Sequence, residues 1–244
     1  MLIPYAVETL EQERPTANRV IIGACVAVSV GAWLGVVPGR LVDAFVLRNA
    51  HPVALVGHMF LHAGILHLAG NMLFLWVFGN AICANVGNVV YPLLYLGAGL
   101  CAALVHLLLD GSPAIGASGA INGITGLVLA MYPLNHVHLL WIVPAGISRG
   151  HHQFRVPVWV MVGAWLVMDV LWMVAGAGGV AYWAHLGGFV AGVVLGLICL
   201  RTGWIQMTEC DNRNLLEIIS GSPRTHAFSS PPRPGGRART RRGF

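Results

Sequence analysis

Long stretches without any charged residue are the feature that most restricts how this sequence can fold. No Asp, Glu, Lys or Arg occurs in residues 49–109, 111–148 or 170–200. A helix needs about 20 mostly apolar residues to cross the hydrocarbon core of a bilayer. Only 9% of the residues are charged and the mean hydropathy is +0.73, whereas a soluble domain carries roughly 25% charged residues. The sequence therefore predicts an all-α, polytopic membrane protein.

Apolar runs and turn signals predict six spanning helices. We expect them at about residues 19–37, 66–86, 89–109, 118–134, 156–174 and 180–200. They divide the chain into a cytoplasmic N-terminal segment (1–18), a six-helix membrane domain (19–200) and a basic, disordered cytoplasmic tail (201–244). Residues 40–57 mix charge with proline, so we expect an outer loop at the membrane interface there. Three glutamates precede the first apolar run, which is not the pattern of a cleaved signal peptide.

The distribution of arginine predicts the orientation, because the chain has no lysine. Six spans place both termini on one side, and that side carries all the arginines except Arg40 and Arg48. An excess of arginine in short loops marks the cytoplasmic side. We therefore expect a multi-pass protein of the cell (inner) membrane with both termini in the cytoplasm. The net charge of +5 lies mostly in the tail, which favours contact with anionic lipid over binding to nucleic acid.

A few polar residues inside the expected spans fall at one depth. The second, fourth and sixth spans all run inward from the outer face. His67 and Asn71 lie near the start of the second, Ser118 starts the fourth, and His185 follows about five residues into the sixth. Polar groups inside a membrane are costly and indicate function by default. These four side chains are therefore predicted to form one cluster near the outer leaflet.

Stripes of small residues predict which of these helices approach each other. Gly119 and Gly123 lie on the fourth span, and Gly188 and Gly192 lie below His185 on the sixth. Such stripes let two helix backbones pack closely. This packing would bring His185 beside Ser118.

The chemistry expected of such a cluster is nucleophilic catalysis. A serine hydroxyl is a weak nucleophile unless a base removes its proton, and His185 is the candidate base. The Ser118 backbone N–H, the His67 imidazole and the Asn71 amide are candidate oxyanion donors. The sequence does not direct Asp169, in the fifth span, at His185, so we expect a Ser–His dyad with Asp169 as a helix-to-helix hydrogen-bond partner.

Two further histidines precede the second span, and the loop before Ser118 contains Pro113 and Gly116. His58 and His62 are four residues apart and are expected to hold water or structure, and the loop is expected to dip into the bundle. The same histidine spacing also suits zinc, but a third ligand is not evident. The five cysteines form no CxxC pair, so no metal site is predicted.

The sequence resembles the rhomboid family of intramembrane serine proteases over about residues 19–200. The resemblance rests on three elements that occur in order on three spans: GASG at 116–119, AHLGG at 184–188 followed by Gly192, and His67-x-x-x-Asn71. His58 and His62 also match histidines of the family. One Gly-x-Ser-Gly element would be weak support, but three in order are specific.

The resemblance implies a rhomboid-like six-helix bundle that cleaves single-pass transmembrane substrates in or near their membrane segments, without a cofactor. It implies lateral access past the fifth span, where Trp165 and Phe74 are candidate gate residues. Many relatives have Tyr or Phe at the position of Asn122, where the ring packs on the catalytic histidine. Asn122 keeps an alternative open, namely a catalytically weak or inactive relative that binds transmembrane helices. A transporter with a His/Asp proton relay is a third alternative, but no internal repeat supports it. The oligomeric state is not predicted.

Overall fold

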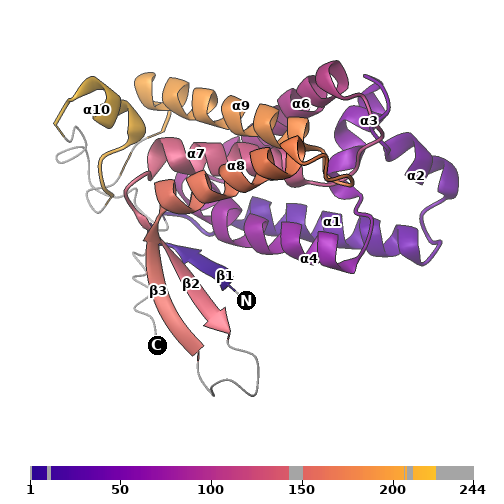
Figure 1. Cartoon of the computed structure of the whole chain (residues 1–244), viewed down its shortest axis with the longest axis horizontal. Helices are drawn as coiled ribbons and strands as arrows, with labels where there is room; N and C mark the ends of the chain where they lie inside the picture. The colour runs from indigo at the N-terminus through magenta and orange to yellow at the C-terminus, as the bar shows by residue number, and fades with distance from the viewer. Residues whose placement is uncertain (1, 10–11, 143–150, 206, 208–210, 224–244) are drawn as a thin grey trace.

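The computed structural model describes residues 2–9, 12–142, 151–205, 207 and 211–223. Figure 1 shows a bundle of helices with a small sheet projecting from one end and the short helices α2 and α3 at the other. The helices and strands are β1 (Leu2–Val7), α1 (Thr16–Trp33), α2 (Gly39–Phe45), α3 (Pro52–Gly57), the 3-10 helix η1 (His58–Phe60), α4 (Ile65–Phe74), the π-helix η2 (Leu75–Gly79), α5 (Asn80–Val86), α6 (Val90–Leu109), α7 (Ser118–Met131), β2 (His136–Ile142), β3 (His151–Pro157), α8 (Val158–Val174), α9 (Tyr182–Arg201) and α10 (Leu215–Ser220).

The six expected spans correspond to six apolar segments. In α1, α6, α9 and the continuous segment Ile65–Val86, the helix is long and apolar enough to cross a membrane. The apolar helices α7 and α8 are shorter, with 14 and 17 residues. The expected helical, multi-pass membrane bundle is therefore confirmed, although a small sheet is added to it.

Several predicted boundaries differ from those of the structure by a few residues, and two of the differences have a local reason. α1 ends at Trp33 rather than near residue 37, because Gly35 turns the chain with a φ of 74°. α8 begins at Val158 rather than 156, because the residues up to Pro157 belong to β3.

Helix α7 is the buried centre of the bundle. Twelve of its 14 residues are buried, and it packs against both α6 and α9. At 1.5 Å per residue it is about 21 Å long, whereas the hydrocarbon core of a bilayer is about 30 Å thick. At least one end of α7 must therefore lie below the membrane boundary.

The expected outer loop of residues 40–57 contains the two short helices α2 and α3. Pro52 is the first residue of α3, where its missing N–H costs nothing. Neither helix exceeds seven residues, so the expectation that this segment does not span the membrane is confirmed.

A three-stranded antiparallel sheet was not predicted. Its order is β1-β2-β3, with Leu2 opposite Trp141 and Val137 opposite Val156. The signal lay in a period of two along β2, where Val137 and Leu139 are buried and the residues next to them are less so.

The expected disorder of residues 201–244 was wrong for residues 211–223. This part contains α10, which begins with a capping box formed by Asn214 and Glu217. The Asn135 side chain donates to the Asp211 carboxylate at 3.5 Å and accepts from the Asn212 backbone N–H at 3.1 Å. These bonds hold the segment against the bundle. Residues 224–244 lie outside the described part of the chain.

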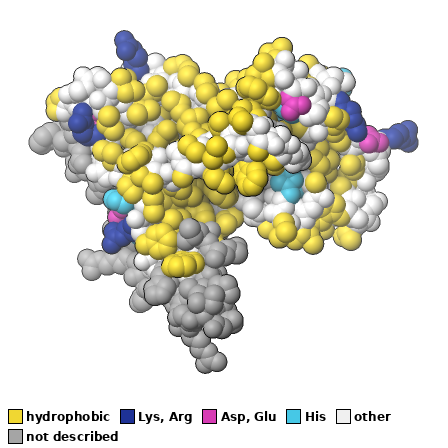
Figure 2. Space-filling model, in the orientation of Figure 1, with side chains coloured by type: hydrophobic (Ala, Val, Ile, Leu, Met, Phe, Trp, Pro, Cys, Tyr) yellow, Lys and Arg dark blue, Asp and Glu magenta, His cyan; other side chains and the backbone are white. Residues whose placement is uncertain are grey.

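The surface of the bundle is mainly apolar. Figure 2 shows hydrophobic side chains over the bundle and charged groups gathered toward its two ends. Large exposed apolar residues are frequent on α8, among them Trp159, Val167, Leu171 and Trp172. An apolar belt between charged ends is the surface that a lipid bilayer stabilises.

Candidate active site

Helices α7 and α9 touch through their backbones along a seam of glycines. A Cβ atom on Gly188 would overlap the carbonyl oxygen of Gly119, and one on Gly192 would overlap the carbonyl oxygen of Gly123. Because no side chain separates the two backbones, the side chains at the ends of the seam are brought close together.

Ser118 and His185 lie at one end of this seam. Ser118 is the first residue of α7, and a Cβ on the next residue, Gly119, would lie 3.6 Å from the Cβ of Ala184. His185 follows Ala184 in the first turn of α9 and is 8% exposed. The two side chains therefore start from facing turns. Within the described part of the chain, Ser118 Oγ makes no direct hydrogen bond to the His185 ring.

The loop before Ser118 descends into the bundle, as expected. Residues 111–113 are exposed, whereas Gly116 and Ala117 are buried. The Gly116 N–H donates to the His58 carbonyl at 2.8 Å, and Leu47 and Ala114 exchange backbone hydrogen bonds of 2.9 and 3.1 Å. The N-terminus of α7 is therefore recessed within the protein, and Ser118 lies below the protein surface at this end.

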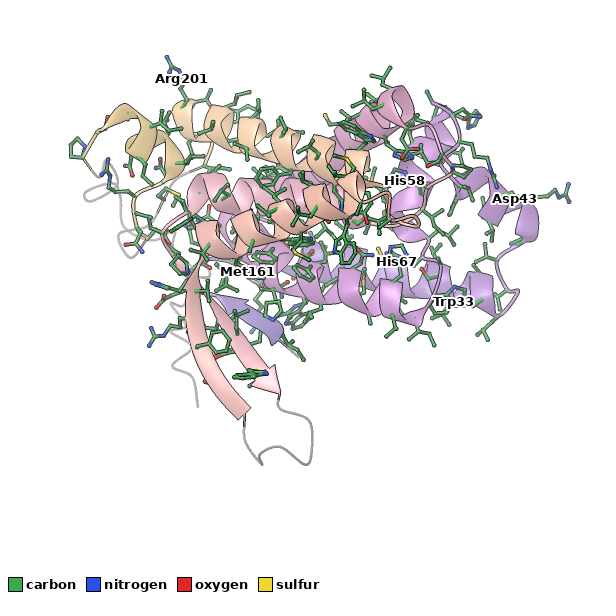
Figure 3. The ribbon with its side chains drawn as sticks, viewed as in Figure 1. Trp33, Asp43, His58, His67, Met161 and Arg201 are labelled. Atoms are coloured by element: carbon green, nitrogen blue, oxygen red, sulfur yellow. The ribbon has the colours of Figure 1, made fainter. Side chains whose placement is uncertain are left out.

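Gly116 is required at its position for two reasons. Its φ of 126° lies in the region that side chains disfavour. A Cβ there would also lie 2.8 Å from Nε2 of His67 and 3.8 Å from Oγ of Ser118. The His67 ring and the Ser118 hydroxyl thus flank the same glycine. Figure 3 shows His67 and His58 in the half of the bundle toward Trp33 and Asp43, away from Arg201.

The hydrogen bonds of His67 determine which of its ring nitrogens is a donor. The Ala63 N–H donates to Nδ1 of His67 at 3.4 Å. In a neutral ring the proton is then on Nε2, the nitrogen beside Gly116 and Ser118. The Asn71 amide donates to the His67 carbonyl at 2.9 Å. His67 therefore presents an N–H to the space next to the serine, with Asn71 one turn along the same helix.

His62 anchors the segment that precedes Ser118, residues 111–117, which we call the serine loop. Its Nε2 accepts from the Ala117 N–H at 3.4 Å, and its Nδ1 lies 3.0 Å from Ser29 Oγ on α1. Burial, together with the nearby His67, lowers the pKa of His62 to about 4, so the ring is neutral at neutral pH. With Nε2 accepting, the proton is on Nδ1, which donates to Ser29.

His58 is likewise bound to protein atoms. Its Nδ1 donates to the Ala54 carbonyl at 2.9 Å, and burial lowers its pKa. These contacts give His58 and His62 a structural part in holding the loop. Among the described residues, no group of three or more His, Cys, Asp or Glu side chains is placed to hold a metal ion.

His185 has a carboxylate partner that sequence reasoning missed. Its Nδ1 lies 2.7 Å from Oδ2 of Asp169 on α8, and the two side chains are 10% and 16% exposed. The rings of Tyr182 and His185 are nearly perpendicular, with their centroids 6.4 Å apart. Asp169 is therefore a helix-to-helix hydrogen-bond partner, as expected, but the sequence did not show that its partner is His185. The rotation of α8 turns this residue toward α9.

The helix α8 also contacts α4 through aromatic rings. The rings of Phe74 and Trp165 have centroids 4.2 Å apart. Trp165 lies one turn before Asp169 on α8. The stretch of α8 from Trp165 to Asp169 is thus held by a ring contact to α4 and a hydrogen bond to α9.

The candidate site residues between His58 and His185 all lie within one recognised domain. Residues 49–202 match the Rhomboid domain. The chain belongs to the rhomboid family.

Rhomboid proteins from several kingdoms are similar to it. Rhomboid protein 1, mitochondrial, of Saccharomyces cerevisiae is 32% identical over 157 residues, which cover 59% of this chain and 41% of the relative. Rhomboid protease GluP of Bacillus subtilis is 42% identical over 69 residues, 28% of this chain and 14% of the relative. RHOMBOID-like protein 6, mitochondrial, of Arabidopsis thaliana is 28% identical over 154 residues, 62% of this chain and 45% of the relative. The chain thus spans less than half the length of these relatives.

At position 122 this rhomboid domain has an asparagine, whereas many relatives have Tyr or Phe there. It is buried, and its amide donates to the Ser118 carbonyl at 3.0 Å within α7. The contacts to the His185 ring come instead from Asp169 and Tyr182. In this rhomboid chain the imidazole is supported from α8 and from its own helix.

Proposed function

We propose that this chain is an intramembrane serine endopeptidase in which Ser118 is the nucleophile and His185 the general base. The observation that carries the proposal is the glycine seam, which sets Ser118 and His185 on facing turns at the recessed end of α7. A hydroxyl and an imidazole at one depth, with the N–H of a second imidazole, that of His67, beside the hydroxyl, suit acyl transfer.

The proposed reaction has two halves. His185 Nε2 takes the proton of Ser118 as Oγ attacks the peptide carbonyl, and it then donates that proton to the leaving amine. Water next attacks the acyl-enzyme with His185 again as base, which releases the carboxylate product and restores the serine. No cofactor is needed for either half.

Three groups are proposed to stabilise the oxyanion. They are the Nε2–H of His67, the Asn71 amide and the backbone N–H of Ser118 at the start of α7, where the helix dipole favours negative charge. Loss of one such donor typically costs about 10²- to 10³-fold in kcat.

The proposed substrates are single-pass membrane proteins cleaved in or near their transmembrane segments. The rings of Phe74 and Trp165 are in contact between α4 and α8, and we propose this contact as the gate for lateral access from the lipid. We also propose that the protein resides in the cell membrane with both termini cytoplasmic and the site open to the outer face.

The test is cleavage of a fluorogenic transmembrane peptide by the purified chain in liposomes. Ser118→Ala and His185→Ala should each abolish cleavage. Ser112→Ala is the matched control, because Ser112 is exposed in the same loop and its hydroxyl should have no part in the reaction. Cleavage that survives both site variants would rule out this function.

A second candidate is a non-catalytic rhomboid that binds transmembrane helices. It is favoured by the absence of a direct Ser118–His185 hydrogen bond in the described structure, although such bonds often form only with substrate bound. A fluorophosphonate probe separates the two candidates, since only an activated serine reacts with it. Labelling that is lost in Ser118→Ala supports the enzyme, and unlabelled chain that still binds the peptide supports the binding protein.

A further inference from the structure

We infer that Asp169 is a positioning residue that holds the imidazole of His185 in the tautomer needed for catalysis, which makes the site a Ser–His–Asp triad assembled from α7, α9 and α8. The inference deepens the proposed function and rests on it. The tautomer of His185 can be tested without an activity measurement, so the inference and the proposed function can fail separately.

The bond itself determines the tautomer. An ionised carboxylate can only accept hydrogen bonds. At 2.7 Å from Oδ2 of Asp169, Nδ1 of His185 must therefore carry the proton. In the neutral ring Nε2 then has its lone pair free, on the side of the ring turned away from Asp169. That lone pair is what a base needs to accept the proton of Ser118.

The surroundings make the bond strong. The two side chains are only 10% and 16% exposed, so water and salt screen the pair weakly. A hydrogen bond to an ionised acceptor is shorter and stronger than one between neutral groups. Asp169 lines a small crevice between α8 and α9, whose other walls are apolar except for Tyr182: Leu166, Val170, Met173 and Leu186. In the part of the chain that the structure describes, His185 is the one side chain that hydrogen-bonds to this carboxylate.

The sequence of α8 argues that Asp169 is there for this bond. It is the one charged residue in a helix of 17 residues that is otherwise apolar. A carboxylate at membrane depth is costly unless it is paired. Asn122 does not supply the support, because its amide is bonded to the Ser118 carbonyl within α7. The ring of His185 therefore depends on α8 for its orientation.

A structural role alone would predict loss of stability, whereas a positioning role predicts a specific loss of turnover. The variants are Asp169→Leu, which removes the acceptor, Asp169→Asn, which keeps the shape but can also donate, and Asp169→Glu, which restores a carboxylate. Met173→Ala is the matched control, because Met173 lines the same crevice without contacting His185 through a polar atom. Each is assayed with the fluorogenic peptide in liposomes, alongside thermal unfolding.

We expect Asp169→Leu to lower kcat by about 100-fold or more with KM changed by less than about threefold, since a positioned base contributes about 10²- to 10⁴-fold. Asp169→Asn should lose nearly as much, because the amide can stabilise the wrong tautomer. Asp169→Glu should recover to within about tenfold, and Met173→Ala should turn over normally. If Asp169→Leu retains kcat within about threefold while Ser118→Ala and His185→Ala are inactive, the positioning role is wrong and the protease proposal stands.

A spectroscopic readout tests the tautomer without relying on activity. The full chain is labelled with ¹⁵N-histidine in detergent micelles, and the His185 signals are assigned by their absence in His185→Ala. We expect Nδ1 to be protonated, with its proton shifted far downfield by the carboxylate. Asp169→Leu should lose that resonance and show a mixture of tautomers. An unchanged His185 spectrum in Asp169→Leu would overturn the inference, whether or not the chain proves to be a protease.

Discussion

Three imidazole rings near Ser118 each have one nitrogen fixed by a protein partner, and this partner decides what the other nitrogen does. Ser29 fixes His62 so that it accepts from the serine loop. The Ala63 N–H fixes His67 so that it donates toward the serine. Asp169 fixes His185 so that it has a lone pair free. Residues of one type thus have three separate functions, because hydrogen bonds outside the site set the tautomers.

His62 should make the stability of the protein depend on pH. Its pKa is lowered from 6.5 to about 4 by burial, so the unfolded chain binds more protons than the folded chain between these values. The stability that the neutral ring contributes is fully present above pH 6.5 and is lost as the pH falls toward 4. Protonation would also set an N–H against the N–H of Ala117.

The measurement is thermal unfolding in detergent at a series of pH values from neutral to mildly acidic. The unchanged chain should lose melting temperature steadily with acid. His62→Gln should lose less, because its amide oxygen accepts from Ala117 without titrating. His58 and the other histidines contribute equally to both proteins. Parallel curves for the two would show that His62 is not the group responsible.

At the scale of elements, helices α7 and α9 pack backbone to backbone along the glycine seam, whereas α8 packs on α9 through side chains. The seam depends on backbone contact, so Gly192→Ala should push the helices apart, because the added methyl group would meet the Gly123 carbonyl. We expect a loss of about 1–3 kcal/mol in unfolding free energy, together with lower turnover. The measurement is thermal unfolding and peptide cleavage of the same preparations.

Gly97→Ala in α6 is the matched control for this prediction. A Cβ at Gly97 has no heavy atom within 4 Å, and alanine in a helix interior is favoured over glycine by about 0.5–1 kcal/mol. The control should therefore be neutral or slightly more stable. Equal destabilisation by both substitutions would mean that helix propensity or lipid contact, and not the seam, dominates.

The difference between the glycine seam and α8 also explains which parts of the fold the sequence could predict. The seam was predictable because glycines at a spacing of four mark the contacting face on both helices. The direction of Asp169 was not, because α8 is apolar on all sides and no pattern fixes its rotation about its own axis. The sheet was missed because the alternation around Val137 is short and lies between two spans, where a loop is the usual expectation. The helix α10 was missed in a segment whose composition favours disorder.

At the scale of the whole molecule, described segments from near the two ends of the chain meet at one end of the bundle. The Asn135 amide donates to the Glu8 carbonyl at 2.7 Å, and its oxygen accepts from the Asn212 backbone N–H. The residues just after β1, the connection from α7 to β2 and the segment before α10 are thus joined at one asparagine. Arg155 and Arg201 lie at this end, whereas Arg40 and Arg48 lie with α2 at the other (Figures 1 and 3).

This arrangement predicts which end faces the cytoplasm, because among the described residues the end with the sheet and α10 carries more arginines than the end with α2. Single cysteines are introduced into a chain whose own cysteines are replaced by alanine. The positions are Asp43→Cys in α2 and Ser220→Cys in α10, both exposed in the structure. In spheroplasts a membrane-impermeant maleimide should label the first directly and the second only after permeabilisation. Peptide cleavage by both variants shows that they are folded. Labelling in the reverse order would place Ser118 near the cytoplasmic leaflet, and it would require substrates to be cleaved from the inner side.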